Sequence, residues 1–473
     1  MTFKNKHKSI KESGQVFTPD YIVCNMLDWI GYTNNSILQK HIIDNSCGDG
    51  AFLQEIVKRY CEIAKKENIA ETVIAQQLST YIHGIEIDDI AYNTCIKNLN
   101  EIINSYNIPS VTWDIINTDA LTITHFNSHM DYVVGNPPYV RVHNLNEQYN
   151  KVKEFCFTSK GMTDLYLAFF EIGFNMLSPT GIMTYITPSS WINSTAAIDL
   201  RKYILKHKNL IALTDLEHYQ AFTNITSYTI ISQFCKSNKH ADTFDYYRYN
   251  PANKERSYQN KLKYTEAYIE GNIYLSTPES IKTINSVFST KDKKIIVKNG
   301  FATLKDKFFI NDTIPESSFT IPVIKASTGK WSKGFFPYDK KGKPFDWDHI
   351  REDKVISTYL IAQKEVFFED EQKDWYLYGR TQALADVHKN KYAISSIVKD
   401  KESIKINFVP PGCGIYSGLY ILTDIDETTL KNLIISDSFI HYIQLLRKYK
   451  SGGYYTFNSK DLQQYLNYKI NHE

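Results

Sequence analysis

Four residues, Asn136-Pro137-Pro138-Tyr139, have types and spacing that suit chemistry on an amino group. They follow the apolar run Tyr132–Gly135, which predicts a strand that delivers them to the edge of a sheet. An Asn side-chain oxygen and the carbonyl of the next Pro can each accept a hydrogen bond from an exocyclic amino group such as that of adenine. Because that nitrogen's lone pair is delocalised into its ring, two fixed acceptors would favour the nucleophilic geometry reached in the transition state. The motif therefore predicts methyl transfer to an amino nitrogen, with Tyr139 offering a ring face to the base. Asn-Pro also favours turn initiation, so an ordinary strand-ending turn is the alternative.

A glycine-rich segment, Asp44-Asn45-Ser46-Cys47-Gly48-Asp49-Gly50, follows the first predicted strand and opens a helix. Small residues at such a turn let the backbone approach a ligand, and a helix N-terminus favours a carboxylate. The segment lacks the G-x-G-x-x-G spacing, so nothing in it indicates a pyrophosphate cradle. A plain turn is the alternative interpretation.

Two further acids end the next two predicted strands. Glu86, in Gly84-Ile85-Glu86-Ile87-Asp88, is placed to accept both hydroxyls of a ribose, and Asp119 is placed to accept from an adenine amino group. Each acid alone is more often a helix cap or a first-turn residue. Three acids at the ends of three consecutive strands, Asp44 included, predict one shared crevice.

A loop upstream of the first strand, Gly14 to Pro19, precedes a predicted helix over Tyr21 to Trp29. Thr18 is expected to cap this helix and Pro19 to be its first helical residue. The same loop can also contact a ligand.

Short β-rich runs alternate with helical patterns through the first 235 residues, which predicts an α/β domain with a mixed, mostly parallel seven-stranded sheet. The predicted strands are 41–44, 81–85, 111–117, 132–135, 181–187, 210–216 and 228–234. The main predicted helices are 52–65, 90–98, 165–177 and 197–205. From about Asp242 the chain is rich in Tyr, Lys and Asn, and Glu279 to Phe288 is a candidate connecting helix. We place the domains at 1–250 and 251–473, with the boundary between residues 240 and 290 and an α+β second domain.

Composition indicates a globular protein without a secretory signal. The chain has 473 residues, 42% of them hydrophobic, enough for two or three cores. Its N-terminus lacks an apolar segment, and the most apolar stretch, 165–186, is interrupted by polar residues, so no membrane span is expected. Seven scattered cysteines without C-x-x-C pairs predict a reduced, cytoplasmic protein without structural zinc.

Net charge is only +2, but it is unevenly distributed. Residues 1–240 contain 20 Lys and Arg against 23 Asp and Glu, whereas residues 241–473 contain 34 against 29. The second half is therefore the candidate for binding a polyanion. A solvated basic surface is the alternative.

These motifs, in this order, resemble the Taq-type DNA adenine-N6 methyltransferases, the gamma group of the amino-methyltransferases that use S-adenosyl-L-methionine. The resemblance covers the first 235 residues and parts of the second half. It implies a Rossmann-like methyltransferase domain followed by a target-recognition domain. It assigns cofactor contacts to Thr18, Pro19, Asp44, Cys47, Gly48, Gly50, Glu86, Ile87, Asp119 and Asn136. Thr18 would contact the methionine end, Asp44 its amino group, Glu86 the ribose and Asp119 the adenine.

The same resemblance implies that Asn136, Pro137, Pro138 and Tyr139 are the catalytic motif. Tyr139 would stack on one face of an extruded adenine. Phe222, in Tyr219-Gln220-Ala221-Phe222, would stack on the other face, with Tyr219 as the fallback.

Two features depart from the family pattern. Asn45 stands where the family commonly has Pro, which removes backbone stiffness and puts cofactor affinity in doubt. The interval from Gly50 to Glu86 is long, and an extra helix around Ala70 to Leu78 accounts for it.

In the second half, the segments 378–382 and 452–457 resemble pieces of the family's recognition domain. Candidate DNA contacts are Arg380 and Gln382 for bases, Arg351, Lys364, Lys448 and Lys450 for phosphates, and Tyr454. Each of these is, taken singly, a common kind of surface residue.

The resemblance implies direct methyl transfer without a metal. Double-stranded DNA would lie between the two domains, with the adenine flipped into the Asn136 pocket. The expected protein is a bacterial, cytoplasmic, nucleoid-associated monomer, with a cognate restriction endonuclease as a candidate partner.

Four alternatives stay open. The motif would also serve a glutamine amide of a protein, or adenine in RNA, and a DNA-binding module could keep the fold without catalysis. A fused restriction-modification enzyme is the fourth: only residues 1–13 precede the first motif, and Glu371-Gln372-Lys373 has a nuclease-like E-x-K spacing without an upstream Asp partner.

Overall fold

The computed structural model describes residues 18–141, 149–159, 163–222, 227–237, 242–291, 294–368 and 374–472. Residues 14–17 of the first loop and Glu371-Gln372-Lys373 lie outside this part of the chain. The chain forms two compact units, residues 1–281 and 282–473. No helix in the described ranges is long and apolar enough to cross a membrane.

The first unit is built on a nine-stranded sheet with strand order β3-β2-β1-β4-β5-β7-β6-β8-β9. Strands β1 to β5 pair in parallel, and β7 is antiparallel to both β5 and β6. The strands are β1 (Ile42–Asp44), β2 (Ile82–Glu86), β3 (Asp114–Asn117), β4 (Met130–Gly135), β5 (Leu177–Pro188), β6 (Leu210–Asp215), β7 (Thr229–Cys235), β8 (Thr243–Asn250) and β9 (Glu255–Lys263). The seven predicted strands are all present, and the predicted total of seven is wrong because β8 and β9 extend the sheet.

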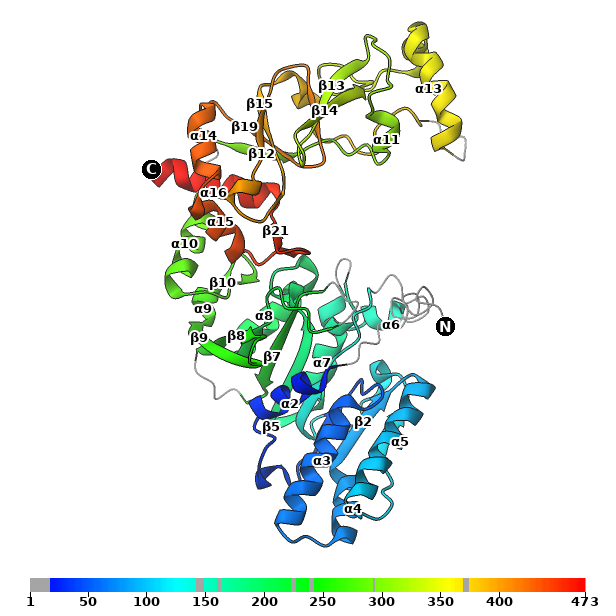
Figure 1. The fold of residues 1–473 in the computed structure, drawn as a ribbon, viewed down its shortest axis with the longest axis vertical. Helices are drawn as coiled ribbons and strands as arrows, with labels where there is room; N and C mark the ends of the chain where they lie inside the picture. The colour runs from blue at the N-terminus through cyan, green and yellow to red at the C-terminus, as the bar shows by residue number, and fades with distance from the viewer. Residues whose placement is uncertain are drawn as a thin grey trace. The chain divides into compact units, whose positions relative to one another are not determined.

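Helices cover this sheet, with α3, α4 and α5 packed on β2 and α7 packed on β4 and β5 (Figure 1). The helices of this unit are α2 (Asp20–Trp29), α3 (Ala51–Lys66), α4 (Glu71–Tyr81), α5 (Asp89–Ser105), α6 (Tyr149–Lys153), α7 (Tyr166–Met176), α8 (Ile198–His207) and α9 (Tyr264–Ala267), and α10 (Pro278–Ser289) crosses its end at Ile281. The extra helix expected between Gly50 and Glu86 is α4, and the expected connecting helix is α10.

The β8–β9 hairpin shows why residue 250 does not end the first unit. Residue 250 is the last of β8, and its strand pairs with β6 on one side and β9 on the other. The unit continues to Ile281, inside the range of 240 to 290 expected for the boundary. The sequence missed this hairpin because most of β9 is exposed, so its side chains lack clear apolar alternation.

The second unit is α+β. A four-stranded sheet has the order β12-β19-β15-β17, and two three-stranded sheets have the orders β14-β13-β18 and β16-β21-β20. The strands are β12 (Ile296–Asn299), β13 (Thr320–Lys325), β14 (Lys330–Phe335), β15 (Lys391–Ile394), β16 (Ile397–Val398), β17 (Ile406–Val409), β18 (Gly414–Tyr416), β19 (Leu419–Leu422), β20 (Tyr449–Lys450) and β21 (Tyr454–Thr456). The helices are α11 (Asp306–Phe309), α12 (Trp347–Glu352), α13 (Lys354–Phe367), α14 (Glu427–Ile434), α15 (Asp437–Leu445) and α16 (Ser459–His472).

Candidate active site

The polar residues predicted to share a crevice end adjacent parallel strands. Asp44 is the last residue of β1, Glu86 the last of β2, and Asn136 follows β4 directly. Asp119 lies two residues beyond β3. Because β2 and β4 flank β1 on opposite sides, this is the point where the strand order reverses, and open α/β sheets bind ligands there.

Asp44 is a buried carboxylate held by its own turn. It is 2% exposed, and its Oδ1 accepts from the backbone N–H of Ser46 at 3.0 Å. Burial raises the pKa of Asp44 to about 7, the Ser46 bond opposes this rise, and the charge of Glu86 adds to it. Gly135 permits the close packing of β4, because a Cβ at this position would lie 2.8 Å from Asp44 Oδ1.

The raised pKa predicts a pH dependence of cofactor binding. If Asp44 binds the amino group of the cofactor, only the ionised carboxylate binds well, so the affinity should fall about tenfold for each pH unit below pH 7. Calorimetric titration between pH 5 and 8 measures this. Asp44→Asn should bind weakly at every pH and lose this slope, apart from any part carried by Glu86. An identical slope in the variant would exclude Asp44 as the titrating group.

The raised pKa of Asp44 also makes the stability of the fold depend on pH. A carboxyl whose pKa is raised in the folded state favours folding while it is protonated. The contribution of Asp44 to the free energy of unfolding is therefore fully present below about pH 4 and is lost as pH rises to about 7.

The loop after β1 is fixed by backbone bonds to β2. The Gly48 N–H donates to Glu86 Oε2 at 2.8 Å, and the Cys47 N–H donates to the Ile85 carbonyl at 3.0 Å. The Cys47 side chain is buried in the hydrophobic core, which fixes the loop to the core. A Cβ at Gly48, where φ is +56°, would meet no atom within 4 Å, whereas a Cβ at Gly50 would lie 2.7 Å from Cys95 Sγ. Gly48 thus leaves open space where a ligand would approach.

Asn45 has a role that its sequence position did not reveal. It is buried, and its amide Nδ2 donates to the hydroxyl of Tyr185 on β5 at 2.7 Å. This side-chain bond ties the turn to the sheet.

The carboxylates of Glu86 and Asp119 each accept hydrogen bonds from nearby backbone N–H groups. Glu86 Oε1 accepts from the Asp88 N–H at 2.8 Å, and burial raises the pKa of Glu86. A carboxylate has about four acceptor sites, so the two backbone bonds leave capacity for ribose hydroxyls. Asp119 caps a short 3-10 helix by accepting from the Leu121 N–H at 3.0 Å, and Lys151 Nζ lies 3.7 Å from its Oδ2. Ile87 beside Glu86 is 54% exposed, an apolar surface that an adenine would cover.

Thr18 does not cap helix α2, so that prediction is wrong. The N-cap is Pro19, without a side-chain cap bond, and Asp20 is the first helical residue. The Thr18 hydroxyl is instead an acceptor for Asn136 Nδ2 at 3.2 Å. The amide nitrogen of Asn136, and not its oxygen, therefore faces Thr18.

The rings of Tyr139 and Phe222 lie next to each other, but they are not arranged as two parallel faces. Their ring centroids are 6.2 Å apart at an interplanar angle of 80°. The Tyr139 hydroxyl donates to the Ile186 carbonyl on β5 at 3.1 Å. Two rings set edge to face leave no parallel gap, so a base stacked between them requires one ring to turn.

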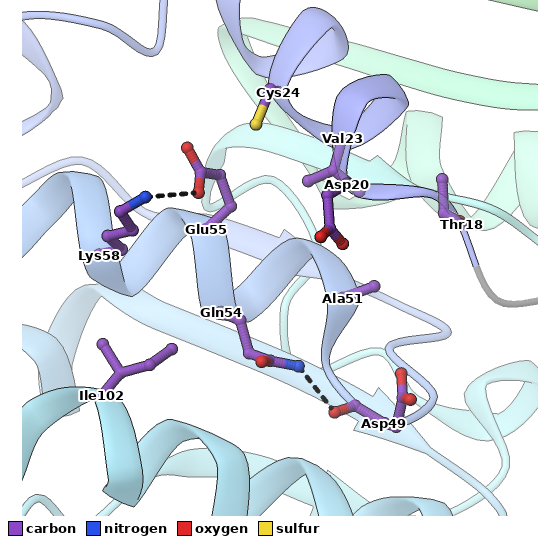
Figure 2. Close-up of a pocket in the computed structure, with 10 residues that line it drawn as sticks. All are labelled: Thr18, Asp20, Val23, Cys24, Asp49, Ala51, Gln54, Glu55, Lys58 and Ile102. Carbon is purple, nitrogen blue, oxygen red and sulfur yellow. Dashed lines mark hydrogen bonds and ion pairs between the residues drawn. The ribbon is translucent and has the colours of Figure 1, made fainter.

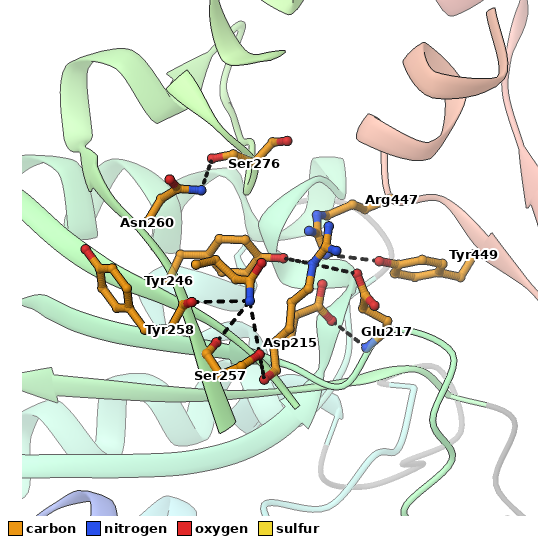
Figure 3. A network of polar contacts seen from close by, with 11 residues as sticks. Asp215, Glu217, Tyr246, Ser257, Tyr258, Asn260, Ser276, Arg447 and Tyr449 are labelled. Carbon is orange, nitrogen blue, oxygen red and sulfur yellow. Dashed lines mark hydrogen bonds and ion pairs between the residues drawn. The ribbon is translucent and has the colours of Figure 1, made fainter. Parts of the chain in front are cut away.

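The loop that carries Phe222 is anchored to β6 and β8. Asp215 Oδ1 accepts from the Glu217 N–H at 2.8 Å (Figure 3). Glu217 Oε1 lies 3.2 Å from Arg248 Nε. The same Arg248 nitrogen donates to the Tyr246 hydroxyl at 3.1 Å. Strand β8 therefore supports the candidate base pocket. Strand β8 could have been predicted from the alternation of aromatic and polar residues over 243–250.

A cleft of about 350 Å³ lies beside this crevice (Figure 2). Its lining is Thr18, Asp20, Val23, Cys24, Asp49, Ala51, Gln54, Glu55, Lys58 and Ile102. It shares Thr18 and the start of α3 with the crevice, but neither Asp44, Glu86 nor Asn136 lines it.

Some of the candidate DNA contacts of the second unit have partners within the protein, and the others are exposed without an ion pair in the described ranges. Gln382 Nε2 donates to the Gly300 carbonyl at 2.7 Å, and Lys448 Nζ lies 2.6 Å from the buried Asp461, so both have structural partners. Arg380, Lys450 and Tyr454 are exposed. Within the described ranges, neither Arg380 nor Lys450 forms an ion pair. Arg351 pairs with Asp348, and Lys364 lies over the ring of Trp375.

The sheet β16-β21-β20 adds Lys399, which the sequence did not reveal. Val398 pairs with Tyr455, and Lys450 pairs with Tyr454, in antiparallel register. Lys399 directly follows β16 and is exposed, and a Cβ on Gly453, the neighbour of Tyr454, would lie 3.8 Å from Lys399 Cε. We call the three exposed residues Lys399, Tyr454 and Lys450 a row, in which Tyr454 and Lys450 are direct cross-strand partners.

Comparison with known proteins agrees with these strand-end motifs. Residues 52–222 match the family model described as Eco57I restriction-modification methylase. This segment contains Glu86, Asp119, the Asn136 motif and Phe222.

The chain is also similar in sequence to curated type II methyltransferases. It is 28% identical over 235 residues to methyltransferase M.BstVI of Geobacillus stearothermophilus, covering 47% of this chain and 42% of that protein. It is 23% identical over 470 residues to the restriction enzyme and methyltransferase RM.Eco57I of Escherichia coli, covering 78% and 47%. It is 25% identical over 411 residues to M.AccI of Acinetobacter calcoaceticus, covering 84% and 66%. The chain thus spans less than two thirds of each relative.

Two solved structures share the fold. The type IIL restriction-modification enzyme MmeI in complex with DNA has a TM-score of 0.63 at 13% identity, covering 97% of this chain and 67% of that one. A DrdV–DNA complex has a TM-score of 0.55 at 12% identity, covering 92% and 53%. The α/β methyltransferase-like fold with a large mixed sheet is confirmed by this likeness.

Proposed function

We propose that this protein transfers a methyl group from S-adenosyl-L-methionine to the N6 amino group of an adenine flipped out of double-stranded DNA. The observation that carries the proposal is Asn136. It stands at the switch point of the sheet, next to the Asp44 strand end, and Thr18 orients its amide. The match to a restriction-modification methylase model supports the reaction class.

The residues of the crevice fit the cofactor by their chemistry. Asp44 would hold the amino group, Glu86 the ribose, and Asp119 with Ile87 the adenine. Gly48 leaves room for the backbone to approach, and the bound cofactor would supply the methyl group. Holding the amino nitrogen and the methyl carbon at near-attack distance would account for much of the acceleration.

Asn136 and the Pro137 carbonyl would accept from the adenine amino group and so favour its nucleophilic form. Tyr139 and Phe222 would stack on the flipped base, each contact contributing about 1 to 3 kcal/mol against the cost of unstacking. Because these rings meet edge to face without DNA, base entry would include the turning of one ring.

An assay with radiolabelled cofactor tests this function against its alternatives. The purified protein is incubated with unmethylated DNA, with total RNA and with a release-factor protein in parallel. We expect label in DNA only. Label in the protein would instead favour glutamine methylation, label in RNA an RNA methyltransferase, and no label at all a DNA-binding module.

The second unit would bind DNA through the row Lys399, Tyr454 and Lys450, together with Arg380. Two cations can neutralise phosphates, and the exposed tyrosine ring can stack on a base or sugar. We further propose that the protein is a monomer that acts at the nucleoid beside a cognate restriction endonuclease.

Alanine at Lys399 or Lys450 should weaken DNA binding and lower the slope of log K against log salt by about 1 for each lysine. Tyr454→Ala should weaken binding about tenfold with the salt slope unchanged. Fluorescence anisotropy across a salt series measures both quantities. Lys431→Ala is the matched control, because Glu427 already neutralises that lysine at 2.6 Å. Equal slopes for all four variants would contradict the assignment of this row.

A further inference from the structure

Two tyrosine hydroxyls join the cofactor side of the crevice to the base side. Tyr21 Oη lies 2.7 Å from Tyr219 Oη, although the residues are 198 positions apart. Tyr21 is the second residue of α2, the helix that follows Thr18, and Tyr219 lies in the connection between β6 and β7 that carries Phe222. Burial, and next the bond with Tyr219, raise the pKa of Tyr21, so this hydroxyl stays protonated at neutral pH.

The β8–β9 hairpin packs against both partners of this pair. The Tyr219 ring lies against that of Tyr249 on β8, with centroids 5.4 Å apart. At the other partner, Lys254 Nζ is 4.8 Å from the Tyr21 ring centroid, and the Lys254 carbonyl accepts from Asn25 of α2 at 2.6 Å. Both rings are therefore held in place independently of their hydroxyl groups.

These contacts close a ring around the candidate site. From Thr18 the ring runs along α2 to Tyr21, across to Tyr219 and along the loop to Phe222. Phe222 then meets Tyr139, whose motif contains Asn136, and Asn136 donates back to Thr18. Phe222 and Tyr249 also share one hydrophobic core with α2. A continuous set of contacts thus links the Thr18 side of the candidate site to the Phe222 side.

We infer that the Tyr21–Tyr219 hydroxyl pair is a positioning contact that couples cofactor binding to the binding of the flipped base. This inference rests on the proposed function. Cofactor at Thr18 would fix α2, and the hydroxyl pair would then hold the Phe222 loop against Tyr139. Each ligand would consequently strengthen the binding of the other by the same factor.

The test uses Tyr21→Phe, Tyr219→Phe and the double variant, since phenylalanine keeps each ring and removes only the hydroxyl. Tyr258→Phe, on the exposed part of β9, is the matched control. The dissociation constant of sinefungin, an unreactive cofactor analogue, is measured by calorimetry with and without DNA that the wild-type protein methylates. The melting temperature of each variant is measured as well.

We expect DNA to tighten sinefungin binding to the wild-type protein and to Tyr258→Phe. The factor by which DNA lowers the dissociation constant of sinefungin should fall about three- to tenfold in each single variant. The double variant should lose no more than either single one, because both break the same bond.

Three results would overturn the inference: no effect of DNA on the wild-type protein, an undiminished factor in the single variants, or losses that multiply in the double variant. A lower melting temperature with an undiminished factor would likewise reduce the pair to a structural role. Failure of the proposed function is seen separately, because the wild-type protein would then place no methyl group on DNA at all.

Discussion

Replacing Asn136 by alanine is expected to lower kcat by about two orders of magnitude or more while cofactor binding changes little. The variant loses one of two acceptors for the amino group, and removal of one such transition-state contact typically costs 100- to 1000-fold. Asp44 and Glu86, the residues proposed to hold the cofactor, are unchanged in this variant. Single-turnover methylation of DNA and calorimetric titration of the cofactor measure the two quantities.

Thr18→Val provides a graded companion to this variant. It preserves the size of the side chain but removes the acceptor that orients the Asn136 amide at 3.2 Å. We expect a loss of about tenfold in kcat, intermediate between the wild-type protein and Asn136→Ala. Near-normal turnover by Asn136→Ala would refute the catalytic assignment.

Gly135→Ala is expected to weaken cofactor binding about 100-fold. A Cβ there would stand 2.8 Å from Asp44 Oδ1, and the backbone φ of +153° is one that side chains of L-residues rarely adopt. Either β4 or the Asp44 carboxylate must move, and a change of about 2.7 kcal/mol in binding corresponds to this factor. The next residue, Asn136, would shift as well, so kcat should fall with the affinity.

Gly31→Ala is the control for this substitution. Gly31 also has a positive φ, +78°, but a Cβ there meets nothing within 4 Å. It should cost stability without altering cofactor affinity. Equal affinities of the Gly135→Ala and wild-type proteins would show that Asp44 does not hold the cofactor.

Much of the first unit was predictable because its central strands are buried and nearly continuous in apolar residues. Residues 132–135 and 210–216 are examples, and these apolar runs identified β4 and β6 within two residues. Strand β9 was missed because it is an exposed edge strand whose side chains follow no apolar period. Its place depends on pairing with β8, a tertiary fact that local sequence does not encode.

For the candidate site, the sequence indicated which residues stand at the strand ends, but not which side chains they contact. Asp44, Glu86 and Asn136 were chosen because each stands at or just after the end of a predicted strand. The bond from Asn136 to Thr18 could not be predicted, because it joins residues 118 positions apart and replaces the expected helix cap. The partner of Lys448 was hidden for the same reason, since Asp461 reaches it only in the folded unit.

The central claim is that Asn136 and its neighbours methylate the N6 nitrogen of adenine in DNA. Long-read sequencing of DNA from cells that express either the wild-type protein or Asn136→Ala tests it directly. We predict N6-methyladenine at one adenine of a single recurring sequence with the wild-type protein, and none with the variant. DNA without N6-methyladenine in the presence of folded wild-type protein, or equal modification by both proteins, would contradict the account.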